Sequence, residues 1–114
     1  MPATADTAGM ADAAFLAKMK DGALLVNAAR GALVGTEDLV AELSSGRLSA
    51  AVDVTEPEPL PPGHPLWTLP NVLITPHVAA STPASVTAGH RFVRQQAERY
   101  LTGQPLANVI TGDY

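Results

Sequence analysis

Short apolar runs alternate with amphipathic stretches along this chain of 114 residues. Three of the apolar runs, at residues 23–28, 49–54 and 71–75, have the length of buried strands. A stretch with helical spacing separates the first two runs, which predicts strand–helix–strand crossovers and hence a parallel sheet. The runs are almost wholly apolar, which predicts helices on both faces of that sheet. The pattern therefore predicts an α/β fold with about three strands and flanking helices.

Three stretches have the apolar spacing of amphipathic helices. The first is expected to bury Phe15 and Leu16 on one face and to end at Gly22. The second is expected to bury Leu39, and the third to end at Gly103. The predicted caps of these helices are Asp12, Thr36 and, for the last, Ser81 or Thr82. Residues 57–70 hold six of the ten prolines, which predicts a loop there.

Composition and charge restrict the possible partners. Seven basic and eleven acidic side chains give a net charge of −4, which argues against nucleic acid or an anionic membrane as the main partner. There are no cysteines, so disulfides and thiolate chemistry are excluded, and three scattered histidines make a zinc site unexpected. No apolar stretch approaches the length of a membrane span, and the first residues lack the features of a secretory signal. We therefore expect a soluble cytoplasmic protein with no resident metal.

A polar side chain follows each predicted strand. The residues in question are Asn27 and Arg30 at the end of the first strand, Asp53 with Glu56 or Glu58 at the end of the second, and His77 at the end of the third. Parallel strands bring their carboxyl ends to one edge of a sheet, where open α/β sheets bind ligands. An arginine can hold a carboxylate with two parallel hydrogen bonds. A histidine oriented by a carboxylate can transfer a proton near neutral pH. These residue types predict a site that anchors an anionic substrate and moves a proton to or from an adjacent oxygen.

Each candidate residue also has an ordinary structural interpretation. Arg30 could satisfy carbonyl groups in a turn, and Glu58 could be a solvated loop charge. Asp53 is harder to explain in this way, because a carboxylate at the end of an apolar strand needs a partner. His64 and His90 are interpreted as an ordinary loop residue and a helix surface residue.

Three stretches of the sequence together resemble one family. They are "MKDGALLVNAARGALV" (19–34), "AVDVTEPEPLPPGHPLW" (51–67) and "LPNVLITPHVA" (69–79). In order and spacing they resemble motifs of the D-isomer-specific 2-hydroxyacid dehydrogenases, which include glyoxylate/hydroxypyruvate reductases and phosphoglycerate dehydrogenase. The resemblance implies a partial, doubly wound Rossmann-type sheet. Residues 1–103 would be the C-terminal portion of a dinucleotide-binding domain, and residues 104–114 resemble the return to a substrate domain.

The resemblance implies a reaction and a role for each catalytic residue. The reaction is reversible hydride transfer between NAD(P)H and a small 2-keto acid. Arg30 would bind the substrate's carboxylate and keto group, and His77 would be the general acid/base. By its spacing from the strand-end aspartate, Glu58 rather than Glu56 would pair with His77.

The resemblance also implies contacts with the cofactor, for which NAD is favoured over NADP. Asp53 would contact the nicotinamide amide, the backbone near Ala28 and Ala29 would face the nicotinamide, and Thr7 resembles a cofactor-contacting threonine. However, no two glycines are spaced as GxG, so the glycine-rich phosphate turn of the family is not found in this sequence. We therefore expect the isolated chain to bind NADH weakly or not at all, and to lack robust activity.

Two other classes of function fit parts of the sequence. The chain could be a non-catalytic remnant or interaction module that associates with itself or a relative through exposed sheet edges. It could also be a receiver-like signalling domain with Asp53 as phosphoacceptor. The second interpretation is disfavoured because no acidic pair near the N-terminus would bind magnesium and no strand-end lysine follows.

Overall fold

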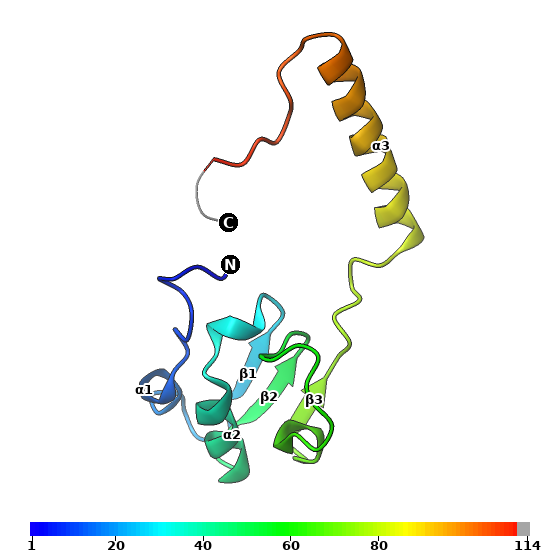
Figure 1. Ribbon diagram of the computed structural model, residues 1–114. Coiled ribbons are helices and arrows are strands. Elements are labelled where there is room, and N and C mark those ends of the chain that lie inside the picture. The colour runs from blue at the N-terminus through cyan, green and yellow to red at the C-terminus, as the bar shows by residue number, and fades with distance from the viewer. Residues whose placement is uncertain (112–114) are drawn as a thin grey trace. The chain divides into compact units, whose positions relative to one another are not determined.

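The computed structural model describes residues 1–111, which form two compact units, Met1–His77 and a second that begins at Val78 (Figure 1). The elements of the first unit are α1 (Ala13–Leu16), β1 (Leu24–Asn27), the 3₁₀ helix η1 (Gly31–Leu33), α2 (Thr36–Ser44), β2 (Ser49–Val52), the 3₁₀ helix η2 (Pro65–Trp67) and β3 (Val72–Ile74). The second unit contains α3 (Pro83–Leu101). The predicted domain division at residue 103 stays a prediction.

The sheet confirms the predicted class. Its order is β1-β2-β3, and both pairings are parallel (Figure 1). Leu25 of β1 lies opposite Ala50 of β2, which in turn lies opposite Val72 of β3. The central strand is β2. Because both pairings are parallel, the carboxyl ends of all three strands lie at the same edge of the sheet.

One face of the sheet carries the hydrophobic core. Leu16 of α1, Leu43 of α2 and Leu48 before β2 are fully buried. The buried side chains of this cluster are Leu16, Leu39, Leu43, Leu48, Ala50, Val52, Leu60 and Leu66. The predicted inner face of α2 is confirmed, since Leu39 belongs to the cluster. The proline-rich loop adds Leu60 and Leu66 to the core, so it is packed rather than only extended.

The opposite face of the sheet is open. Leu24 and Val26 of β1 are 57% and 64% exposed, and Leu73 of β3 is 61% exposed. The prediction that helices cover both faces is therefore wrong for these residues. Successive strand side chains alternate between faces, and α1, α2 and η2 meet only the set that includes Ala50 and Val52. An apolar run does not indicate whether its second face has a partner in the same unit.

The first helix is shorter than predicted. Asp12 caps it as expected, with Oδ1 accepting the Phe15 N–H at 2.8 Å. Leu16 is buried, but Phe15 is 46% exposed, and α1 ends at Leu16 rather than near Gly22. The physical reason is a tertiary contact, because Arg47 Nη2 donates to the Leu16 carbonyl at 2.7 Å.

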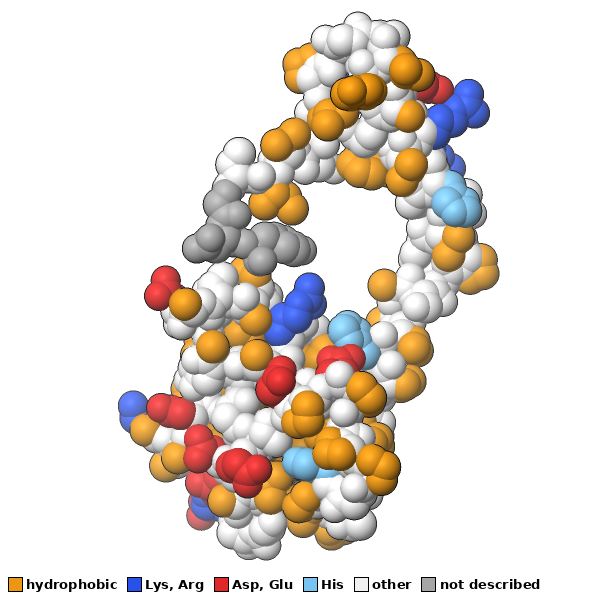
Figure 2. All heavy atoms as spheres, viewed as in Figure 1, with side chains coloured by type: hydrophobic (Ala, Val, Ile, Leu, Met, Phe, Trp, Pro, Cys, Tyr) orange, Lys and Arg blue, Asp and Glu red, His pale blue; other side chains and the backbone are white. Residues whose placement is uncertain are grey.

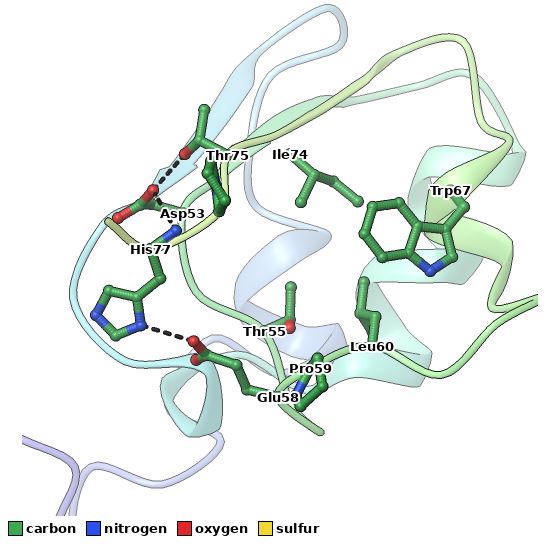
Figure 3. A pocket seen from close by; sticks show the side chains of 10 residues that line it. Asp53, Thr55, Glu58, Pro59, Leu60, Trp67, Ile74, Thr75 and His77 are labelled. Carbon is green, nitrogen blue, oxygen red and sulfur yellow. Dashed lines mark hydrogen bonds and ion pairs between the residues drawn. The ribbon is translucent and has the colours of Figure 1, made fainter. Parts of the chain in front are cut away.

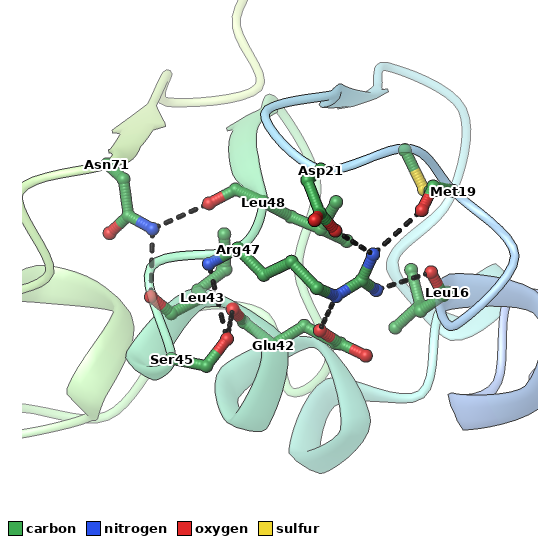
Figure 4. A network of polar contacts seen from close by, with 9 residues as sticks. All are labelled: Leu16, Met19, Asp21, Glu42, Leu43, Ser45, Arg47, Leu48 and Asn71. Atoms are coloured by element: carbon green, nitrogen blue, oxygen red, sulfur yellow. Dashed lines mark hydrogen bonds and ion pairs between the residues drawn. The ribbon is translucent and has the colours of Figure 1, made fainter.

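Arg47 is the centre of the polar network shown in Figure 4. Its Nη1 donates to the Met19 carbonyl and its Nε donates to Glu42 Oε2, both at 2.7 Å. The Arg47 and Glu42 side chains are only 24% and 21% exposed. The Arg47 hydrogen bond holds the pKa of Glu42 below its usual value, and the same bond raises the pKa of Arg47. This network attaches the segment after α1 to the turn between α2 and β2.

The cap of α2 also differs from the prediction. Gly35 occupies the N-cap position, and Thr36 is the first helical residue. The Thr36 hydroxyl does not cap the helix because it donates to the Glu56 carbonyl at 2.7 Å. A side chain expected to start a helix instead holds the loop that follows β2.

In the second unit, Thr82 caps α3 as predicted, with its Oγ1 accepting the Ser85 N–H at 3.1 Å, and Pro83 lies in the first turn. Gly103 follows the helix with φ +66°. No residue of α3 is buried, and Tyr100 is 76% exposed. Figure 2 shows hydrophobic side chains on the surfaces of both units. Within residues 1–111, no helix is both long and apolar enough to cross a membrane.

Candidate active site at the carboxyl ends of the strands

The turn after β1 is organised by Asn27, the one polar residue among the described residues that is buried, at 7% exposure. Its Nδ2 donates to the Arg30 carbonyl at 2.9 Å, and its Oδ1 accepts the Ala29 N–H at 3.1 Å. Arg30 itself is exposed and extended, with φ −146° and ψ 141°, and its Nη1 donates to the Ala29 carbonyl at 2.7 Å. The other guanidinium N–H groups make no hydrogen bond within residues 1–111 and are free to meet an anion.

Gly31 brings this turn against the loop that follows β2. A Cβ atom built on Gly31 would lie 2.0 Å from the Thr55 carbonyl oxygen and 2.8 Å from the Glu56 nitrogen. Only a residue without a side chain allows this approach. Sequence analysis did not identify Gly31, whose only signal was its place directly after Arg30.

His77 and Glu58 form an acid–base pair at the end of β3 (Figure 3). Nδ1 of His77 lies 2.6 Å from Oε1 of Glu58. The two side chains are 45% and 42% exposed, so solvent reaches the pair. Glu56 contributes only a backbone carbonyl, which accepts from Thr36. Nε2 of His77 makes no hydrogen bond within the described residues, which leaves one ring nitrogen for an incoming ligand.

Asp53, at the end of β2, interacts with the segment that carries His77. Its Oδ1 accepts the His77 backbone N–H at 3.1 Å and also accepts the Thr75 hydroxyl (Figure 3). His77 has φ +52°, a left-handed conformation that few residues other than glycine adopt. Sequence analysis did not identify Thr75, which has the sequence context of the last residue of an apolar strand.

Two hollows adjoin Asp53. The first, of about 290 Å³, lies beside the acid–base pair, and its apolar wall is formed by Leu60, Trp67 and Ile74 (Figure 3). The second, of about 140 Å³, lies on the open face of the sheet at its carboxyl edge. Its lining residues are Val26, Asn27, Ala28, Ala51, Val52, Asp53, Leu73 and Thr75. Asp53 and Thr75 line both hollows.

The predicted cofactor contacts are therefore only partly brought together. Ala28 and Asp53 line the hollow on the open sheet face, and Ala29 lies in the adjoining turn. Thr7 lines neither hollow, and its hydroxyl donates to the Pro2 carbonyl at 2.9 Å. His64 lies in the proline-rich loop, where its Nδ1 accepts the Leu66 N–H at 3.3 Å and caps η2.

The sequence of this unit matches a known family. Residues 1–79 match the family described as D-isomer specific 2-hydroxyacid dehydrogenase, NAD binding domain, and the chain belongs to this family. This result confirms the resemblance found in the sequence motifs. It also supports NAD or NADP as the cofactor, and the receiver-like interpretation of Asp53 is set aside.

Individual relatives agree with this assignment. A glyoxylate reductase/hydroxypyruvate reductase of Mus musculus is 50% identical over 80 residues, which are 69% of this chain and 24% of the relative. A solved structure from Thermus thermophilus is 42% identical with a TM-score of 0.88, covering 97% of this chain and 36% of that one. The NADPH-dependent glyoxylate/hydroxypyruvate reductase of Sinorhizobium meliloti, solved with NADP and sulfate, is 37% identical with a TM-score of 0.82, covering 96% and 36%. The chain thus spans about a third or less of these relatives.

Proposed function

We propose that this chain supplies the nicotinamide end of the active site of an NAD(P)-dependent oxidoreductase that interconverts small 2-keto acids and D-2-hydroxy acids. The observation that carries the proposal is the 2.6 Å contact between His77 Nδ1 and Glu58 Oε1. A carboxylate that accepts from Nδ1 fixes the orientation of the ring and leaves Nε2 to face a substrate. In the reduction direction, Nε2 then donates its proton to the keto oxygen of the substrate.

Arg30 is proposed to hold the substrate carboxylate. Its guanidinium can form two parallel hydrogen bonds with a carboxylate. The Nη1 bond to the Ala29 carbonyl and the Asn27 bonds to the same turn limit the directions in which this side chain extends. A substrate anchored by its carboxylate presents its keto group in one orientation, which is the main contribution a protein makes to such a reaction.

The residues on the open sheet face fit the nicotinamide end of the cofactor. Ala28 has a small, exposed side chain that leaves room for a flat ring. Asp53 Oδ2 makes no hydrogen bond within the described residues, so it can accept from a carboxamide N–H. Ala28, Ala29 and Asp53 are therefore proposed to contact the nicotinamide, with Thr7 as a further proposed cofactor contact. When bound, the cofactor supplies the hydride.

The test separates cofactor binding from chemistry. Titration of the isolated chain with NADH is expected to show weak or no binding, since no GxG turn is present to hold the phosphates. Activity is tested in a chimaera in which residues 1–111 replace the equivalent segment of the Sinorhizobium meliloti reductase, with NADH or NADPH and glyoxylate. His77→Gln is expected to lower kcat/KM by about 10²–10⁴-fold. Glu58→Gln is expected to lower it as well, because the contact that orients the imidazole is weakened.

His90→Gln, on α3, is the matched control and is expected to leave kcat/KM unchanged. Full activity of the His77→Gln chimaera would contradict the proposed role of His77. Robust glyoxylate reduction by the isolated chain would contradict the expected weakness of cofactor binding.

A second proposal concerns association, with a cytoplasmic location proposed for either function. The exposed apolar side chains Leu24, Val26 and Leu73 on the open sheet face support self-association as a non-catalytic alternative. Light scattering after size exclusion is expected to give a mass above the 11.8 kDa of one chain. Val26→Lys is expected to return the mass to that of one chain, and a monomeric parent chain would contradict the proposal.

A further inference from the structure

The backbone of His77 is held by a carboxylate on the neighbouring strand. Oδ1 of Asp53 accepts the His77 N–H at 3.1 Å and the Thr75 hydroxyl as well. Pro76, between the two donors, has no N–H of its own and has a fixed φ. The three residues "TPH" therefore direct two donors, two positions apart, to one oxygen atom.

His77 adopts a conformation that requires such support. Its φ is positive, at +52°. Within residues 1–111, Asn108 is the only other residue besides glycines with a positive φ. Residues with a Cβ avoid this region unless their surroundings hold them there. A hydrogen bond from an N–H to a carboxylate is stronger than one between neutral groups, and the Thr75 hydroxyl restricts the rotation of that carboxylate.

We propose that Asp53 and Thr75 are positioning residues for His77: they fix its left-handed backbone and thereby direct Nδ1 to Glu58 and Nε2 to the substrate. The hydrogen bonds from the His77 N–H and the Thr75 hydroxyl to Asp53 Oδ1 are called the clamp below. The catalytic role of the clamp rests on the proposed function, whereas the clamp itself does not. Because the imidazole is attached to this backbone, a change in φ at His77 moves both ring nitrogens. The 2.6 Å contact with Glu58 then depends on a hydroxyl group that is hydrogen-bonded to Asp53 and not to His77 or Glu58.

The two carboxylate oxygens of Asp53 differ in their hydrogen bonds. Oδ1 holds the His77 segment, and Oδ2 has no hydrogen bond within the described residues. Asp53 also lines the hollow on the open sheet face, where the nicotinamide is proposed to lie. One carboxylate would thus relate the position of the proton donor to the position of the cofactor, so Asp53 itself is a poor choice for separating the two roles.

The test uses Thr75 in the intact 114-residue chain, without substrate or cofactor. Thr75→Val keeps the branched shape and removes the donor, and NMR reports the solvent exchange of the His77 amide and the ¹⁵N shifts of its ring. Exchange is expected to accelerate about tenfold or more, as for the loss of a bond to a charged group. Both ring ¹⁵N shifts are expected to change. Thr75→Ser, which restores the hydroxyl, is expected to restore both signals.

Thr68→Val is the matched control, because the Thr68 hydroxyl also makes one hydrogen bond, to the Pro65 carbonyl at 3.1 Å. It is expected to leave the His77 signals unchanged. Wild-type His77 signals in Thr75→Val, or no recovery in Thr75→Ser, would overturn the proposal. If Thr75→Val does not fold, Asp53→Ala, which removes the acceptor and is measured here without cofactor, is interpreted in the same way, with faster His77 amide exchange expected and unchanged exchange contradicting the clamp. A chimaera that is inactive while these signals behave as expected would refute the proposed function and leave the clamp standing.

Discussion

Replacing Gly31 by alanine perturbs the contact between the Arg30 turn and the loop after β2. The added Cβ would lie 2.0 Å from the Thr55 carbonyl oxygen and 2.2 Å from its carbonyl carbon, both of which are backbone atoms. A flexible side chain could move aside, but here the backbone of residues 55–56 must shift. Reaching even 3.0 Å, the shortest separation that real Cβ atoms tolerate, requires about 1 Å of displacement.

The displacement has two calculable consequences. Overpacking of this kind costs about 1–3 kcal/mol in the free energy of unfolding. It also displaces the loop that bears Glu58, which lies three residues after Thr55. The Nδ1–Oε1 distance is 2.6 Å, and a displacement of about 1 Å is larger than the range of distances over which such a hydrogen bond forms. In the chimaera proposed above, a misplacement of this size is expected to lower kcat/KM by about 10²-fold.

Trp67 provides the assay, because it is the only tryptophan in the chain and belongs to the first unit. Urea unfolding followed by its fluorescence gives the loss of stability in Gly31→Ala. Gly89→Ala is the control, since a Cβ there meets nothing within 4 Å and alanine favours a helix such as α3. The Trp67 transition is expected to be unchanged in Gly89→Ala. A Gly31→Ala chain that keeps both the wild-type transition and the wild-type His77 ring shifts would refute the reasoning.

Two further predictions concern stability. Leu43→Ala, at a side chain 1% exposed, is expected to cost about 2–5 kcal/mol in the same urea assay, whereas Phe15→Ala, at 46% exposure, is expected to cost clearly less; equal losses would contradict the burial pattern. The pKa of Glu42 is lowered in the folded state by Arg47, so the pair stabilises the fold above the ordinary value of 4.5 and that stability is lost as pH falls through the lowered pKa. Urea midpoints measured between about pH 7 and pH 3 are expected to lose this part of their acid dependence in Glu42→Gln. The control variant Glu37→Gln is expected to keep it. An unchanged acid dependence in Glu42→Gln would refute the proposed contribution of the Glu42–Arg47 pair.

The three strands and the cap of α3 could be predicted from the sequence, because both depend on local patterns. The sequence was insufficient for α1, whose predicted second half is replaced by turns where Arg47 binds the Leu16 carbonyl from a distant part of the chain. Thr36 has the sequence context of a cap, yet its hydroxyl bonds to the Glu56 carbonyl 20 residues later. Contacts of this kind are set by tertiary packing, which local propensity does not describe.

The polar residues at the strand ends were also predictable, because parallel strands end at one edge. The choice between Glu56 and Glu58 was not, and it came from the family resemblance alone. The structure brings Glu58 to His77 and uses only the backbone of Glu56. Gly31 was not predictable because its role is the absence of a side chain, which becomes apparent only when the opposing backbone is in place.

The acid–base pair cannot be what holds the site together. Glu58 and His77 are 42% and 45% exposed, and ion pairs at that exposure contribute little to stability. The order of the site must therefore come from the segment that leaves the central strand β2. At its start, Asp53 holds the backbone of His77 beyond β3, and two residues later Thr55 packs against Gly31 beyond β1. It follows that Glu58→Gln should lower kcat/KM of the chimaera without lowering the stability of the chain, whereas Gly31→Ala should lower both.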